Sequence, residues 1–194
     1  IIKGLEKKGA KHLSITPVMT SRGCPFDCSF CSVTGMFGQQ YRFRSKENVI
    51  AELKVHKDNG SNWVFFYDDN FTANKNRTKE LLRLMIEKNI TPKWTAQVRV
   101  DVAKDPELLE LMKKANCHTV YIGLESINPE TLKRYNKKQS VEDIENCIKK
   151  LHDNGIRIHG MFVFGSDDDT VETIRETVAF AKKNDLESVQ FMIL

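Results

Sequence analysis

Short apolar runs alternate along this chain with longer segments whose apolar residues recur at helical spacing, and the pair repeats six times. The apolar runs are rich in β-branched and aromatic residues and are bounded by polar turns, which predicts strands. Proline is a poor strand residue, so Pro17 weakens the prediction for the first run. The predicted strands are residues 13–19, 63–67, 94–98, 119–123, 158–164 and 189–194.

The segments between the strands begin and end with helix-capping residues. Ser140 is a good N-cap, and the segment after it stops at Asn154-Gly155, a typical left-handed C-terminal cap. Proline follows Asp105 and Asn128, as it does at the first position of many helices. The predicted helices are residues 46–57, 74–88, 106 onward, 129 onward, 141–153 and 169–183.

The last predicted helix carries two further expectations. The acidic run 167–169 is expected to cap its N-terminus and to complement the positive end of the helix dipole. Apolar residues recur along this helix at a spacing that predicts one buried face. The residues predicted to form that face are Val171, Ile174, Val178 and Ala181.

Alternation of strands and helices predicts an α/β fold in which parallel strands are joined by right-handed crossovers. Each unit takes roughly 30 residues, close to the repeat of an eight-unit TIM-like barrel of about 250 residues. Six units would form a partial (β/α)6 barrel with a parallel sheet, or an open doubly wound sheet. Periodicity alone does not separate the two, and in both architectures ligands bind at the carboxyl ends of the strands. We expect one domain over residues 1–194, and Ile1 in place of methionine indicates a fragment of a longer protein.

Composition and charge narrow the classes of function. The chain has 30 basic and 26 acidic residues, and this small excess does not predict a nucleic-acid-binding protein. No apolar run approaches the roughly 18 residues of a membrane span, and no signal peptide opens the chain. Five cysteines, three of them clustered, are unlike a secreted disulfide framework and favour a cytoplasmic protein.

The clustered cysteines are the strongest chemical signal. Cys24, Cys28 and Cys31 follow a C-x-x-x-C-x-x-C pattern. Iron–sulfur clusters are held by cysteine thiolates, so three of them can ligate three irons of a cubane and leave the remaining iron open to a non-protein ligand. A structural zinc site would need a second pair of cysteines or histidines, and none of the 5 histidines forms such a pair. Cys117 and Cys147 are predicted to be small buried residues.

Polar residues follow the predicted strands at the end where ligands are expected to bind. Each also has a structural explanation, because aspartate and asparagine are common in turns and caps, and loop charges are often solvated or paired. Their convergence on one face, beside the cysteine loop, favours a functional role for Asp69 and Glu125. The strand-end residues are Asp68, Asp69, Asn70, Arg99, Asp101, Glu125, Ser126 and the turn 165–169.

With Phe30 before the last cysteine, the motif C-x-x-x-C-x-aromatic-C resembles the signature of the radical S-adenosylmethionine (SAM) superfamily. The resemblance extends from Thr20 to Leu194 and implies a partial (β/α)6 barrel with a 4Fe–4S cluster. It also implies that SAM binds the open iron through its amino and carboxylate groups. An electron from a reductant such as flavodoxin or ferredoxin would then cleave SAM to methionine and a 5′-deoxyadenosyl radical.

The same resemblance implies cofactor contacts for individual residues. The family commonly has a Gly-Gly-Glu-like segment after the second strand, which receives the methionine amino group. This chain departs from that segment in its residues but keeps acceptor oxygens there. The implied contacts are Asp68, Asp69 and Asn70 for the amino group, Gln97, Arg99, Glu125 and Ser126 for the ribose or carboxylate, and Phe30, Val163 and Gly165 for the adenine.

A finer resemblance, in residues 38–45 and 67–71, is to the branch often fused to a cobalamin-binding domain. No D-x-H-x-x-G cobalamin signature occurs in this sequence, so any cobalamin would bind through a domain outside it. We therefore expect an enzyme that cleaves SAM for hydrogen abstraction or, with cobalamin, for methyl transfer to an unknown substrate. The alternatives are a non-catalytic iron–sulfur module for electron transfer or sensing, and a zinc-bound scaffold.

Overall fold

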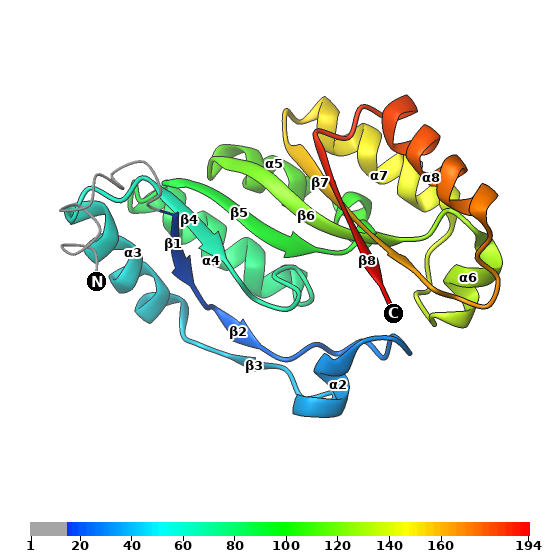
Figure 1. The fold of residues 1–194 in the computed structure, drawn as a ribbon. Helices are drawn as coiled ribbons and strands as arrows, with labels where there is room; N and C mark the ends of the chain where they lie inside the picture. The colour runs from blue at the N-terminus through cyan, green and yellow to red at the C-terminus, as the bar shows by residue number, and fades with distance from the viewer. Residues whose placement is uncertain (1–14) are drawn as a thin grey trace, which may run out of the picture.

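The computed structural model describes residues 15–194, and its main feature is a six-stranded sheet (Figure 1). All six predicted strands are confirmed; residues 13 and 14 of the first prediction lie outside the described part of the chain. Neighbouring strands of this sheet are parallel throughout. The strands are β1 (Ile15–Val18), β4 (Trp63–Phe66), β5 (Lys93–Val98), β6 (Cys117–Glu125), β7 (Arg157–Phe164) and β8 (Ser188–Ile193).

The strand order, β1-β4-β5-β6-β7-β8, follows the order along the chain without a reversal. A doubly wound sheet reverses its order at a switch point, whereas a barrel does not. Sequential order with right-handed crossovers also places the connecting helices on one face of the sheet. The architecture is therefore the partial barrel. Its edge strand β1 accommodates Pro17, because one side of an edge strand needs no hydrogen-bonding partner.

The helices between these strands begin at or beside their predicted starts, and the last helix begins two residues later than predicted. Gly60 and Gly155 follow α3 and α7 with φ of 80° and 71°, the left-handed conformation that their Asn-Gly pairs predict. No helix of residues 15–194 has the length and apolar character needed to cross a membrane. Side chains that accept a first-turn amide hydrogen bond are Ser45, Asn74, Asp105, Asn128 and Ser140. The helices are α3 (Lys46–Asp58), α4 (Lys75–Glu87), α5 (Pro106–Lys114), α6 (Pro129–Arg134), α7 (Val141–Asp153) and α8 (Val171–Lys183).

Short elements around the cysteine loop were not predicted, because they are too brief to show a period. Strand β2 (Ser21–Arg22) precedes the loop, helix α2 (Ser32–Phe37) follows it, and β3 (Arg42–Phe43) returns to pair antiparallel with β2. The two strands of this small second sheet lie side by side and lead into and out of the segment that holds the loop and α2 (Figure 1). A 3-10 helix, η1 (Val100–Lys104), follows β5.

The core lies between the sheet and the helices. Phe66 stacks on Phe71 with ring centroids 4.8 Å apart, and Trp94 packs edge-on against Phe66. Both predicted small buried cysteines belong to this core, which confirms that prediction. Desolvation by burial raises the pKa of the Cys147 thiol to about 12, so it stays protonated and unreactive at neutral pH.

Helix α8 differs from its prediction at its N-terminus and on its buried face. Its N-cap is Thr170, whose hydroxyl accepts from the Thr173 amide, and not the acidic run 167–169. Asp169 instead accepts hydrogen bonds from the amides of Gly165 and Ser166, which it holds in the turn after β7. The predicted buried face is wrong at Val171 and Ile174, which are 65% and 43% exposed, and right at Ala181. The buried face is formed by Thr173, Thr177, Phe180 and Ala181.

Candidate functional site

The cysteine loop lies at the carboxyl end of the parallel sheet, where it contacts residues that follow β4 and β5. The amide of Gly23 donates to Asp69 Oδ2 at 3.0 Å, which ties the start of the loop to the end of β4. The amide of Cys31 donates to the carbonyl of Cys28 at 3.0 Å, so residues 28–31 form a tight turn before α2. The sequence-based placement of the loop after the first strand, beside other strand ends, is confirmed.

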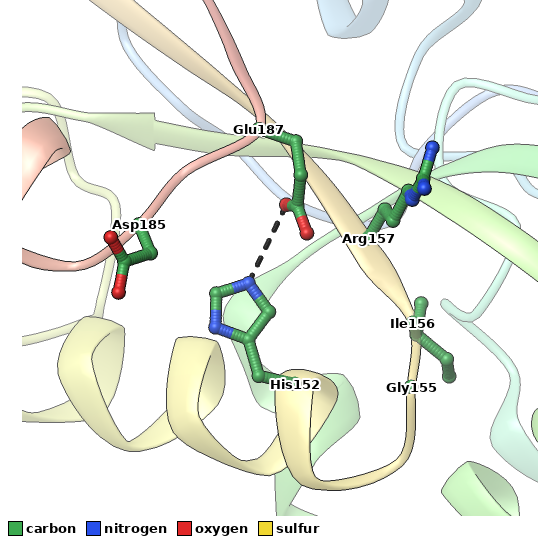
Figure 2. Close-up of a pocket in the computed structure, with 6 residues that line it drawn as sticks. All are labelled: His152, Gly155, Ile156, Arg157, Asp185 and Glu187. Atoms are coloured by element: carbon green, nitrogen blue, oxygen red, sulfur yellow. Dashed lines mark hydrogen bonds and ion pairs between the residues drawn. The ribbon is translucent and has the colours of Figure 1, made fainter.

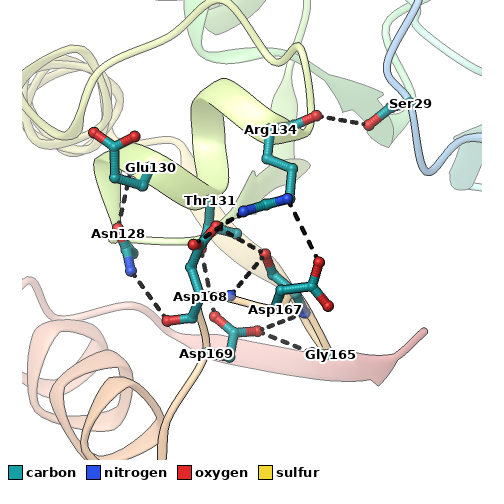
Figure 3. Close-up of polar contacts among 10 residues, drawn as sticks. Ser29, Asn128, Glu130, Thr131, Arg134, Gly165, Asp167, Asp168 and Asp169 are labelled. Carbon is teal, nitrogen blue, oxygen red and sulfur yellow. Dashed lines mark hydrogen bonds and ion pairs between the residues drawn. The ribbon is translucent and has the colours of Figure 1, made fainter.

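The connection between α6 and α7 supports the loop from the other side. The Ser29 amide donates to the carbonyl of Tyr135 at 3.1 Å, and the Asn136 side chain donates to the carbonyl of Asp27 at 2.7 Å. The rings of Phe30 and Tyr135 lie 5.0 Å apart. Figure 3 shows the further contact of the Ser29 hydroxyl with the backbone at Arg134. No sequence motif pointed to this support, because its residues are more than 100 positions from the loop.

The three thiols of the loop suit an iron–sulfur cluster. All are free of disulfides; Cys28 is buried, and Cys24 and Cys31 are partly exposed. Desolvation raises the pKa of the Cys24 thiol, so ligation would have to draw off its proton. Within residues 15–194 no three His, Cys, Asp or Glu side chains converge tightly enough to hold a single metal ion. In a cubane each cysteine ligates a different iron, so the sulfurs surround the cluster and do not meet at one ion.

The acidic segment after β4 divides into buried and exposed residues. Asp68 is 1% exposed, and its two carboxylate oxygens accept from the Thr20 amide at 2.6 Å and from the Ser21 hydroxyl at 2.6 Å. Asn70 is also buried, and its backbone carbonyl accepts from the Tyr41 hydroxyl at 2.7 Å. Asp69 is exposed, and among the contacts of residues 15–194 only its Oδ2 is engaged, by the Gly23 amide. Asp69 is thus the member of this segment with a free carboxylate oxygen.

The two cofactor contacts predicted at the end of β5, Gln97 and Arg99, differ in burial and in hydrogen bonding. Gln97 is half-buried, and within residues 15–194 its side chain has no hydrogen-bond partner. Arg99 is 8% exposed, and its Nη1 donates to the Sγ of Cys28 at 3.3 Å. Its Nη2 donates to the carbonyl of Lys137, and its guanidinium lies 4.0 Å from the centre of the Phe26 ring. The structure therefore brings Arg99 to the cysteine loop itself.

Glu125 and Ser126, predicted at the end of β6, are both buried and both engaged. Glu125 Oε1 lies 2.6 Å from Nζ of Lys137, a residue that the sequence-based analysis missed. The Ser126 hydroxyl accepts from the amide of Asn128, where it forms the turn into α6. Glu125 has a positive φ of 63°, which is uncommon for a residue with a side chain. The end of β6 is thus shaped to direct a carboxylate inward to a buried cation.

Two predicted adenine-flanking residues share a shallow hollow between the cysteine loop and the end of β7. Phe30 and Gly165, the latter with a φ of 113°, both line it. Val163 is buried in β7 just below. An ion pair between Arg134 and Asp168, with Nε and Oδ2 2.8 Å apart, closes one side (Figure 3). The lining residues are Ser29, Phe30, Arg134, Tyr135, Gly165, Ser166, Asp167 and Leu194.

A second hollow lies at the opposite end of the sheet, beside the amino ends of β7 and β8 (Figure 2). Glu187 spans it: its Oε2 accepts from the Ile158 amide at 2.8 Å and lies 3.5 Å from Nε2 of His152. These contacts fix the start of β7 to the segment before β8. In barrel folds residues at this end serve stability and the opposite end carries the chemistry. The hollow is therefore not part of the candidate site.

Comparison with known proteins finds that nearly all of the chain is similar to radical SAM enzymes. The model of the Radical SAM superfamily matches residues 18–181. An uncharacterized methyltransferase of Pyrococcus horikoshii is 36% identical over 190 residues, which cover 97% of this chain and 41% of that protein. The bacteriochlorophyllide d C-12(1)-methyltransferase of Chlorobaculum tepidum is 32% identical over 188 residues, covering 95% of this chain and 41% of that protein. The chain thus spans less than half the length of these relatives.

The fold has a similar counterpart among solved structures. TsrM of Kitasatospora setae, a radical SAM methyltransferase with cobalamin and a [4Fe–4S] cluster bound, matches with a TM-score of 0.84 at 24% identity. The match covers 92% of this chain and 36% of that one. At this identity the likeness establishes the fold, and it agrees with the partial barrel read from the strand order.

Proposed function

The chain belongs to the radical SAM superfamily, and we propose that it forms the SAM-cleaving core of a longer, cobalamin-dependent methyltransferase. Enzymes of this family use a 4Fe–4S cluster and SAM, and they need a reductant and a substrate. When bound, the cluster and SAM supply one-electron chemistry, in which a carbon–sulfur bond breaks to give methionine and a 5′-deoxyadenosyl radical. Family membership favours this enzyme over the non-catalytic iron–sulfur module and the zinc scaffold.

The loop cysteines Cys24, Cys28 and Cys31 would hold the cluster. Three observations support this assignment: the thiols are free, they lie on one loop, and that loop sits at the carboxyl end of the sheet. The loop is fastened on two sides, by Asp69 and by the connection that carries Tyr135. Such fastening keeps the thiols in place as the ligands of a cluster, since preorganised first-shell groups depend on a rigid surround.

Four of the predicted SAM contacts have groups free to meet a ligand. The second carboxylate oxygen of Asp69 would accept from the methionine ammonium, and the amide of Gln97, which has no partner among residues 15–194, would meet the ribose or the carboxylate. Phe30 and Gly165 both line the hollow beside the loop, which supports the proposal that they contact the adenine. A Cβ at Gly165 would lie 3.3 Å from Leu194 Cβ, so glycine keeps this wall thin.

The remaining predicted contacts are already satisfied within the protein. Their polar groups hold the strand ends and the loop in position, so we propose that they act on SAM through the shape of the site. Val163 is the one predicted contact in this group with an apolar side chain, and it would contribute apolar surface next to the adenine. The residues in this supporting group are Asp68, Asn70, Arg99, Glu125 and Ser126.

Methyl transfer is supported by relatives, and chiefly by the 36% identical methyltransferase that matches 97% of this chain. Cobalamin would bind through a domain outside residues 1–194. Because the chain spans 41% of that relative, the substrate would also be recognised largely by parts outside it. The electron donor would be a low-potential protein such as flavodoxin or ferredoxin. A cytoplasmic location accords with the free thiols of all described cysteines.

The test uses the full-length protein, purified without oxygen, reconstituted with iron and sulfide, and supplied with dithionite, cobalamin and SAM. Radical cleavage releases 5′-deoxyadenosine, and donation of a methyl group releases S-adenosylhomocysteine. We expect both products by mass spectrometry, and neither from a Cys28→Ala variant. If only 5′-deoxyadenosine forms, methyl transfer is wrong and hydrogen abstraction remains. If the cluster forms but neither product appears, the proposed core function is wrong.

A further inference from the structure

Arg99 is the charged side chain that contacts the cysteine loop most directly. Its guanidinium is 8% exposed and lies 4.0 Å from the centre of the Phe26 ring, a residue inside the loop. Its Nη1 donates to Cys28 Sγ at 3.3 Å, and its Nη2 donates to the carbonyl of Lys137. The contacts place Arg99 between the loop and the connection that supports it, with little surface left to meet a ligand.

The geometry points to Arg99 as a positioning residue that fixes Cys28 and raises the reduction potential of the cluster. This inference rests on the proposed function, because it requires a cluster on the loop. A hydrogen bond from a charged donor to a ligand sulfur is among the features that set the potential of an iron–sulfur centre. Reduction adds one negative charge to the cluster, so a buried positive charge beside a ligand sulfur stabilises the reduced form more than the oxidised one.

Burial makes this effect large enough to measure. Charge–charge interactions are weak in water and stronger where solvent is excluded, and Arg99 and Cys28 are both buried. The planar guanidinium holds the sulfur and the carbonyl of Lys137 at the same time, which a lysine cannot do in the same geometry. Arg99 therefore contributes both a hydrogen bond of fixed direction and a positive charge. Substitution by lysine keeps the charge, and substitution by methionine removes both.

Arg77 provides a matched control elsewhere in the same protein. Its guanidinium also donates to backbone carbonyls, those of Thr20 and Arg44, at 2.8 and 3.0 Å. It also lies over an aromatic ring, that of Phe43, at 4.7 Å. Unlike Arg99, it makes no hydrogen bond to a cysteine sulfur of the described chain. A general effect of removing a buried or half-buried arginine would appear in both variants. A specific effect on the cluster would appear only in the Arg99 variant.

The experiment is an EPR-monitored redox titration of the full-length reconstituted protein without SAM, in the wild type, Arg99→Met, Arg99→Lys and Arg77→Met. We expect Arg99→Met to lower the ratio of reduced to oxidised cluster at a fixed potential about tenfold, which is ~59 mV for one electron. Arg99→Lys keeps the charge and is expected to shift the ratio less, with fewer irons bound per chain. Arg77→Met is expected to leave the ratio unchanged.

An Arg99→Met protein that holds a full cluster at the wild-type potential would overturn the inference. If Arg99→Met does not fold, Arg99→Lys decides: iron content and potential both equal to wild type would overturn it, and a loss of iron at unchanged apoprotein stability would support positioning. A wild-type protein that forms no cluster contradicts the proposed function instead. The two failures are therefore distinguishable, and neither readout depends on turnover.

Discussion

Nζ of Lys137 lies 2.6 Å from Oε1 of Glu125, and the two side chains are only 6% and 5% exposed. The pair joins the end of β6 to the connection between α6 and α7. That connection also carries Tyr135 and Asn136, which hold the cysteine loop through backbone and side-chain hydrogen bonds. A buried ion pair is weak evidence for stability in itself, but removal of one partner leaves an uncompensated buried charge. The pair therefore fixes the connection between α6 and α7 to the end of β6, and through that connection it helps to hold the cysteine loop in place.

Lys137→Met should lower the free energy of unfolding by about 3–5 kcal/mol, because Glu125 would remain buried without its cation. Urea unfolding of the full-length apoprotein measures the loss. The double variant Lys137→Met/Glu125→Gln removes both charges and should recover a substantial part of it. A double variant whose loss equals the sum of the two single losses would show that the pair carries no coupling, contrary to this reading.

The absence of a side chain at Gly123 leaves room for the ion pair between Glu125 and Lys137. A Cβ at that position would lie 2.1 Å from Glu125 Oε1 and 2.8 Å from Lys137 Nζ. Gly123→Ala should therefore displace the pair and destabilise the protein by roughly 1–3 kcal/mol, as overpacking in a core does. Gly35→Ala is the matched control, because a Cβ at Gly35 meets nothing within 4 Å and alanine favours the helix there. Thermal unfolding compares the two; equal melting temperatures would refute the steric argument.

Cys147 should make the protein less stable at high pH. Its folded pKa is raised by burial to about 12 from an ordinary value of 9.0. Above pH 9 the unfolded thiol ionises while the folded thiol stays neutral, so this contribution to stability is complete below pH 9 and is lost as pH rises toward 12. Urea unfolding at pH 8 and pH 10.5 should show a steeper loss in wild type than in Cys147→Val. Parallel losses in the two proteins would contradict this origin of the pH dependence.

Local patterns in the sequence were sufficient for the strands and for most helix starts. Strand residues alternate or run apolar over short spans, and caps such as Asn74 and Ser140 act within one helical turn. Helix α8 shows where local patterns fail. Its buried face carries Thr177, whose hydroxyl donates to the Thr173 carbonyl and so satisfies itself within the helix. A polar residue of this kind can be buried, and apolar spacing does not identify it.

Only those features of the candidate site that depend on residues close together in the sequence could be predicted. The cysteine loop was recognisable because its three cysteines lie within eight residues of one another. The partners of the predicted polar residues were not, since Lys137 and Tyr135 belong to no motif and approach through the fold. Strand-end position correctly predicted that Arg99 lies at the loop, but it could not indicate that Arg99 and Glu125 are both buried and already paired. Those facts depend on packing between segments far apart in the chain.

Asp68 and Asp69 are adjacent in sequence, and their environments predict opposite consequences of the same substitution. Asp69 is exposed with one free carboxylate oxygen, so Asp69→Asn should weaken SAM binding about tenfold, as loss of a charge-assisted hydrogen bond does, and leave unfolding nearly unchanged. Asp68 is 1% exposed and holds the turn at Thr20 and Ser21, so Asp68→Asn should destabilise the protein by about 1–3 kcal/mol. Equilibrium binding of SAM to the reconstituted protein and urea unfolding of the apoprotein separate the two effects. If Asp69→Asn binds SAM as tightly as wild type, Asp69 is not the ammonium acceptor and only its contact with Gly23 remains as its role.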